Sequence, residues 1–223
     1  MYHLTSHLRL NAVYWGLTAV TIMKHPDALD RTELIDFVMK CWDQKTGAPS
    51  VIFSLAPWLL FLYPYPNSGS TAPPPVARLS DWVLPPPGAF GAHPRHDAHI
   101  LPTLSGIQIL VMLDALPVLD GAPDGGPSYK SRIIDFILSL QHPSAKSFSG
   151  DRFGETDTRF CYCAVSALSL LGTLNKLDID GTAAYIRRCK NFDGGYGSDV
   201  GGESHASQGE PARSRSIAPQ VAC

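Results

Sequence analysis

One spacing of residue types occurs three times in this chain of 223 residues. An aromatic residue lies in a Gly-rich turn, an acid follows seven residues later, and a polar residue follows two positions after the acid. The three sets are Phe90–Asp97–His99, Phe148–Glu155–Asp157 and Tyr196–Glu203–His205. A recurrence of this kind predicts a stacked or closed array of similar units, with functional residues where the units converge.

Each unit also contains a segment with helical periodicity just before the Gly-rich turn. These segments are residues 34–41, 133–140 and 183–190, aligned on Phe37, Phe136 and Tyr185. In the second segment, Ile133, Phe136, Ile137 and Leu140 fall at i, i+3, i+4 and i+7. This periodicity is typical of an amphipathic helix that buries one face.

A second type of helix is predicted after the acid of each unit. These segments, residues 8–20, 103–113 and 156–171, are apolar nearly all round. A helix that is apolar on every side is expected to be buried on every side. Gly172 follows the last of them and is expected to end it in the left-handed conformation. The alternation predicts an all-α fold with an outer and an inner layer of helices.

The polar residues of the repeat are expected to lie at one mouth of the array, where the inner helices begin. His7 and Arg9 have the same separation as Asp157 and Arg159. If the inner helices run parallel, His7 joins Asp157, His99 and His205 at this mouth.

Residues 48–88 do not fit the repeat. They contain ten of the nineteen prolines, and proline cannot continue the surrounding helices. Removing them joins CWDQKTG to AFGAHPRHDAH and restores the spacing of the other units. We interpret 48–88 as an insert, either retained intron sequence or a disordered surface loop. The domain then comprises 1–47 and 89–208, and 209–223 form a tail whose composition predicts disorder.

The bulk composition excludes several classes of protein. A net charge of −2 lacks the basic footprint of a nucleic-acid-binding protein. The five scattered cysteines lie in apolar contexts, which indicates reduced thiols in a cytoplasmic protein. The start of the chain lacks the apolar core of a signal peptide. The apolar run 51–63 is shorter than the roughly 20 residues that span a membrane, so no transmembrane segment is expected.

Three motifs resemble the β subunits of protein prenyltransferases, most closely those of the type II (Rab) geranylgeranyltransferase. They are HLRLNAVYWGL, GDRFGETDTRFCYCAV and NFDGGYG followed by GGESHA. The resemblance implies a partial α-α toroid of helical hairpins around an apolar funnel. It also implies a heterodimer with an α subunit that transfers geranylgeranyl from geranylgeranyl diphosphate to C-terminal cysteines of Rab GTPases, which an escort protein presents.

The resemblance also implies an isoprenoid and diphosphate site. Its candidate residues are His205, Arg159, Trp15, Tyr14 and Asn11. His205 matches the histidine of the family's ESHAG motif, although Ser207 replaces the glycine. Three of these residues also have a plainer reading. His205 fits a surface turn, Arg159 fits an ion pair with Asp157 or Glu155, and Trp15 fits an apolar core.

The family activates the substrate cysteine with zinc. The resemblance places the zinc ligands, an Asp, a Cys and a His, beyond the point where this chain loses the pattern. We therefore assign no catalytic residue and no metal ligand, and expect neither stoichiometric zinc nor turnover. Two alternatives stay open: a truncated, non-catalytic fragment of the toroid, or a farnesyltransferase or type I geranylgeranyltransferase β subunit.

Two other candidate metal sites are weaker. Cys161 and Cys163 lie two residues apart on a helix and point in different directions, so we assign both to the core. His93, His96 and His99 are spaced by three, but a zinc site there needs further ligands and a more regular backbone than Pro94 favours. Cys223 ends the chain without the three residues that follow a prenylated cysteine.

Overall fold

Two kinds of helix alternate along the chain. The computed structural model describes residues 2–43, 88–122 and 125–208. The helices that follow the polar residues are α1 (Arg9–Ile22), α4 (Ile100–Met112) and α6 (Thr158–Leu170). The helices that precede the Gly-rich turns are α2 (Arg31–Lys40), α5 (Tyr129–Ser139) and α7 (Ile179–Arg188). The prediction of an all-α fold is confirmed.

Short elements connect these helices. The 3₁₀ helices are η1 (Tyr2–Leu8), η2 (Pro26–Ala28), η4 (Leu116–Asp120), η5 (Leu174–Lys176) and η6 (Ala206–Gln208), and the strands are β1 (Trp42–Asp43) and β2 (Ala89–Phe90). No helix in the described ranges is both long and apolar enough to cross a membrane.

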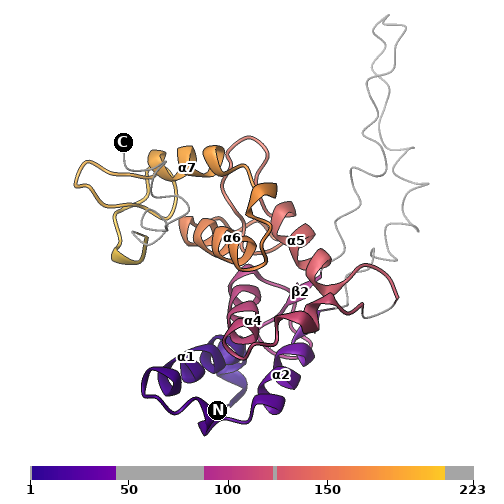
Figure 1. Cartoon of the computed structure of the whole chain (residues 1–223). Helices are drawn as coiled ribbons and strands as arrows, with labels where there is room; N and C mark the ends of the chain where they lie inside the picture. Colours follow the sequence, from indigo (N-terminus) through magenta and orange to yellow (C-terminus); the bar gives the residue numbers. More distant parts are fainter. Residues whose placement is uncertain (1, 44–87, 123–124, 209–223) are drawn as a thin grey trace, which may run out of the picture.

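Helix α4 is the centre of the inner layer. It packs against α1 on one side and α6 on the other, and it also contacts α2. Figure 1 shows α1, α4 and α6 one after another in a row, and α2, α5 and α7 lie along the outer side of this row. Nine residues of α4 are buried, as expected for a helix that is apolar nearly all round.

The outer helices begin at side-chain caps and bury one face. Asp30, Ser128 and Asp178 each accept a hydrogen bond from the backbone N–H three residues later, at 2.8, 3.2 and 2.9 Å. Such caps satisfy backbone donors that the helix itself leaves unpaired. The predicted buried face of α5 is confirmed, because all four of its predicted residues, from Ile133 to Leu140, are at most 7% exposed.

The aromatic residue of each unit fixes the turn to the preceding outer helix. Phe90, Phe148 and Tyr196 pair antiparallel with Trp42, Gln141 and Lys190, respectively. The rings of Phe90 and Phe148 are fully buried, and Tyr196 packs partly buried against the core. Gly106 on α4 leaves room for Phe90, since a Cβ there would lie 2.8 Å from the ring.

Hydrogen bonds between units set the register of the repeat. The backbone N–H groups of Leu10, Ile100 and Thr158 donate to the carbonyls of Ala92, Gly150 and Ser198, respectively. Each acceptor lies two residues after the aromatic residue of the next unit. Arg9 therefore occupies the position of His99 and Asp157, and Asn11 that of Arg159. The predicted equivalence of His7 with Asp157 is wrong by two residues.

The end of α6 agrees with expectation, but the surface of α1 does not. The predicted left-handed glycine after α6 is confirmed, because Gly172 has φ +70°. The prediction that α1 is buried on every side is wrong, since only Leu10 and Leu17 are buried. Among the described helices, α1 has an inner neighbour on one side only, α4, so its other face lies open.

Two predicted segments lie outside the described residues. One is the insert 48–88, apart from Gly88, which contains the run 51–63; the other is the tail 209–223, which contains Cys223. The residues on either side of the insert are paired, Trp42 with Phe90 and Asp43 with Ala89. The equivalent pairs Gln141–Phe148 and Lys190–Tyr196 are joined by residues 142–147 and 191–195 alone. The ends of the predicted insert thus lie at one turn of the array.

Candidate functional site

The last polar residue of each repeat caps the helix that follows it. His99 Nδ1 accepts from Leu101 N at 3.1 Å, and Asp157 Oδ1 accepts from Arg159 N at 2.7 Å. His205 Nδ1 accepts from the N–H of Ser207 in η6 at 3.2 Å. The shared position is therefore explained by the backbone: an acceptor is needed where each helix starts.

The starts of α1 and α4 are close enough to share one hollow. A cavity of about 610 Å³ is bordered by His7 at the end of η1, by Asn11 in the first turn of α1, and by His99 and Leu101 at the start of α4. Of the four residues expected at one mouth of the array, His7 and His99 line this hollow, although His7 is not a cap, whereas Asp157 and His205 are not among its lining residues. Trp15 and Tyr14 are not among the residues that line this hollow.

Asn11 is the most unusual residue of this hollow. Its Oδ1 atom is buried and has no hydrogen-bond partner among the described residues. A buried acceptor without a donor is costly, and such atoms often mark a place where water or a ligand supplies the missing bond. Asn11 is therefore suited to accept a hydrogen bond from a group that enters the hollow.

Arg159 forms an ion pair with the cap of its own helix. Its Nε and NH2 atoms donate to the two carboxylate oxygens of Asp157 at 3.0 and 2.8 Å. The Asp157 side chain is 8% exposed and that of Arg159 is 48% exposed. The hydrogen bond to Asp157 raises the pKa of Arg159 further above its usual range. The paired reading of Arg159 is thus confirmed, and about half of its side chain stays exposed.

The other two candidate residues of α1 differ in exposure. Trp15 is 66% exposed, and its ring centroid lies 5.1 Å from that of Tyr14, which is partly buried against the core. The reading of Trp15 as a core residue is wrong. An exposed aromatic side chain such as Trp15 can contact an apolar ligand or another protein surface.

No metal centre is formed by the described residues, since no three His, Cys, Asp or Glu side chains come together there. His93 is engaged elsewhere: its Nε2 lies 2.7 Å from Arg9 NH1, and its Nδ1 lies 2.9 Å from the carbonyl of Pro94. Cys161 and Cys163 are buried core residues, as expected, and burial raises the pKa of the Cys161 thiol. None of the described cysteines forms a disulfide.

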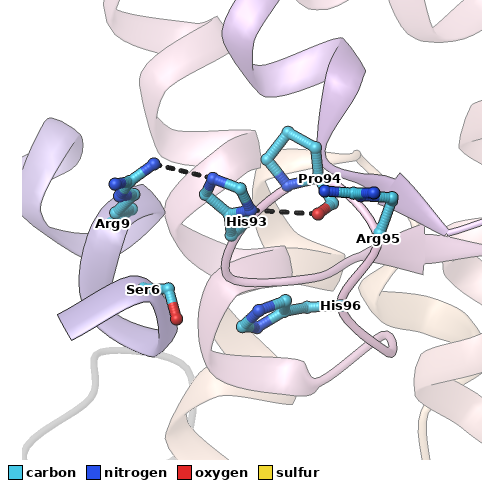
Figure 2. Close-up of a pocket in the computed structure, with 6 residues that line it drawn as sticks. All are labelled: Ser6, Arg9, His93, Pro94, Arg95 and His96. Atoms are coloured by element: carbon cyan, nitrogen blue, oxygen red, sulfur yellow. Dashed lines mark hydrogen bonds between the residues drawn. The ribbon is translucent and has the colours of Figure 1, made fainter. Parts of the chain in front are cut away.

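A second hollow was not predicted from the sequence. It lies between the start of α1 and the turn that follows β2, and its volume is about 470 Å³. The residues that line it are Ser6, Arg9, His93, Pro94, Arg95 and His96 (Figure 2). The sequence signal for it is the Pro94–Arg95 pair in the first repeat.

The cap at His99 predicts a pH-dependent stability. Burial is the main effect that lowers the pKa of His99, and it outweighs the opposing charges of Asp151 and Glu155. Below the unfolded value of about 6.5, the unfolded chain therefore binds more protons than the folded chain. Stability is expected to be complete above this pH and to fall as the pH drops toward the folded pKa, because protonation also removes the Nδ1 acceptor.

Urea unfolding at pH 7.5 and pH 5 measures this effect. His99→Asn keeps a capping acceptor that does not titrate, and it is expected to reduce the loss of stability between the two pH values. The matched control is His142→Asn, because His142 is also a histidine but is exposed and lies in the loop after α5. An unchanged pH dependence in His99→Asn would show that other groups are responsible.

Comparison with known proteins agrees with this arrangement. The family model of the prenyltransferase alpha-alpha toroid domain matches residues 1–209. The chain is 41% identical over 207 residues to the geranylgeranyl transferase type-2 subunit beta of Saccharomyces cerevisiae, covering 93% of this chain and 49% of the relative. It is 40% identical over 209 residues to the subunit of that name from Candida albicans, with the same coverage.

A farnesyltransferase subunit is a more distant relative. The protein farnesyltransferase subunit beta of Arabidopsis thaliana is 24% identical over 198 residues, which are 86% of this chain and 40% of the relative. The chain spans about half the length of the curated relatives it matches. The matched domain covers nearly all of the chain and accounts for its alternating helices, so this chain belongs to the prenyltransferase alpha-alpha toroid family.

Proposed function

We propose that this chain forms part of the toroid of a type-2 geranylgeranyl transferase β subunit. The proposed reaction transfers geranylgeranyl from geranylgeranyl diphosphate to C-terminal cysteines of Rab GTPases. The observation that carries the proposal is the 41% and 40% identity to two subunits of this name, against 24% to a farnesyltransferase subunit. The proposed partners are an α subunit and an escort protein, and the proposed location is the cytoplasm.

His205 and Arg159 are the proposed donors to the diphosphate. The Ser207 N–H donates to His205 Nδ1, so a neutral His205 carries its proton on Nε2. This nitrogen can donate to a diphosphate oxygen, because the residue is exposed. Arg159 is held in place by Asp157 and offers a permanent positive charge. Donors fixed in this way stabilise the charge that develops on a leaving diphosphate.

The proposed isoprenoid contacts come from the open face of α1. The exposed Trp15 packs there beside the partly buried Tyr14, and Asn11 lies on the same helix close to its start. Burying exposed aromatic surface against an isoprenoid chain is favourable, at about 25 cal/mol per Å² of apolar area. Trp15 and Tyr14 would therefore bind the hydrocarbon chain, while His205 and Arg159 would bind the diphosphate.

Zinc is the proposed metal of the complete site. It would lower the pKa of the substrate thiol and so generate a thiolate nucleophile. The described residues do not bring three suitable ligands together, so they do not provide this site. We therefore derive no step of the reaction through the metal from this part of the chain.

Binding of isoprenoid diphosphates by the chain in complex with an α subunit tests the proposal. Geranylgeranyl diphosphate is expected to bind more tightly than farnesyl diphosphate. Arg159→Gln is expected to weaken binding about tenfold, since it removes a charge-assisted hydrogen bond. Phe192→Ala is the control, because the Phe192 side chain is fully exposed and is not one of the proposed site residues.

Two results would contradict the proposal. Equal or tighter binding of farnesyl diphosphate would favour the farnesyltransferase reading, and no binding of either would exclude an isoprenoid site. Transfer to a Rab GTPase bound to its escort protein, measured on the same complex, distinguishes a transferase from a part of the toroid that only binds.

A further inference from the structure

The second hollow, between the start of α1 and the turn after β2, has the composition of an anion site. Two of its side chains are guanidinium groups, two are imidazoles and one is a hydroxyl. None of the described residues that line it carries a carboxylate. All five polar side chains are of types that can donate hydrogen bonds. The electrostatic potential of such a hollow favours a negatively charged ligand.

The hydrogen bonds of His93 hold its ring against Arg9. The Arg9 guanidinium can only donate, so His93 Nε2 accepts from it at 2.7 Å. The Pro94 carbonyl can only accept, so His93 Nδ1 donates to it at 2.9 Å. His93 thereby positions Arg9, and the two guanidinium groups supply the fixed positive charge of the hollow.

The backbone of the turn indicates that Arg95 is placed here at a cost. The His96 N–H donates to the His93 carbonyl at 3.0 Å, Pro94 is the second residue of the turn, and Arg95 has φ +75°. These features define a type II turn, whose third position strongly favours glycine or asparagine. An arginine in this conformation is strained, and strained residues of this kind cluster at binding sites.

We propose that this hollow binds a phosphate group through Arg9 and Arg95. A phosphomonoester carries close to two negative charges at neutral pH, which matches the two guanidinium groups. Figure 2 shows the His93 and His96 rings directed toward the segment that carries Ser6 and Arg9. The volume of about 470 Å³ also leaves room for an organic group beside the phosphate. The site is separate from His205 and Arg159, so its occupancy is a separate measurement from isoprenoid diphosphate binding.

Arg95→Gly provides a sharp test, because its two expected effects have opposite signs. Glycine relieves the strained turn, so the melting temperature is expected to rise by about 2 °C. The same change removes a guanidinium donor, so phosphate binding is expected to weaken about tenfold. Loss of binding in a more stable protein cannot be attributed to unfolding.

Lys24→Gly is the matched control. Lys24 also has a left-handed backbone, with φ +63°, and it also carries one positive charge, but it lies after α1 and outside the hollow. Glycine there is expected to give a similar rise in melting temperature, since this is the usual position of a glycine after a helix. Phosphate binding is expected to stay unchanged.

The readout is the NMR chemical shift of the His93 and His96 imidazoles in the full chain. Inorganic phosphate and phosphoserine are titrated separately at constant ionic strength, with sodium acetate as the control anion. Saturable shifts with phosphate but not acetate, weakened in Arg95→Gly alone, would support the proposal. Tighter binding of phosphoserine would indicate a phosphorylated side chain as the source, and equal or weaker binding would indicate free phosphate. Shifts that do not saturate, or that are the same in Arg95→Gly, would overturn it.

Discussion

Replacing Phe148 by alanine is expected to lower the free energy of unfolding by about 3–5 kcal/mol, the usual range for a buried phenylalanine. The Phe148 side chain is fully buried, and its backbone pairs with Gln141 at the end of α5. Removing the ring leaves a cavity between the outer helix and the turn. A rigid repeat of this kind cannot collapse to fill that cavity without moving the neighbouring unit.

Urea unfolding followed by far-UV circular dichroism measures this effect. Phe192→Ala is the matched control, since the Phe192 side chain is fully exposed in the turn of the next unit. This control is expected to change stability by no more than about 0.5 kcal/mol, as surface substitutions usually do. A loss below about 1 kcal/mol for Phe148→Ala, the typical effect of any point mutation, would show that the repeat aromatic is not a main support of the fold.

Deleting residues 48–88 is expected to stabilise the protein by about 2 kcal/mol, from the lower entropy of closing a shorter loop. Trp42 and Phe90 are paired, and they are separated by residues 43–89. After the deletion, residues 43–47 and Ala89 would join them. This linker is as long as residues 142–147, which join Gln141 to Phe148.

The melting temperature and the urea midpoint of the deletion variant test this prediction. Replacing 48–88 by a Gly/Ser linker of equal length is the control, because it changes the sequence but keeps the loop length. The control is expected to match the parent chain. If the deletion destabilises the protein, residues 48–88 form part of the fold and the insert hypothesis fails.

Much of the fold was predictable from local patterns. The buried face of α5, the left-handed Gly172 and the positions of the three Gly-rich turns follow from periodicity and from the backbone freedom of glycine. The capping role of Asp157 was implicit in its position just before an apolar helix. These features depend on residues within one or two helical turns of each other, so the sequence carries them directly.

The candidate site was less predictable. Trp15 has the same apolar surroundings in the sequence as a core residue, yet it is exposed because α1 has an inner neighbour on one side only. The register of the first unit was wrong for a related reason. It is set by the hydrogen bond from Leu10 to Ala92, and no local pattern indicates which residues that far apart will pair.

The sequence by itself determined that the chain is an array of helical units and which family the array belongs to. The recurring aromatic, acid and polar residues are requirements of each unit, so they are visible wherever a unit occurs. Only the tertiary structure decided that Arg9, His93 and Arg95 line one hollow. The physical reason is that this contact forms when the start of α1 packs beside the turn after β2, and its geometry follows from long-range packing rather than from periodicity.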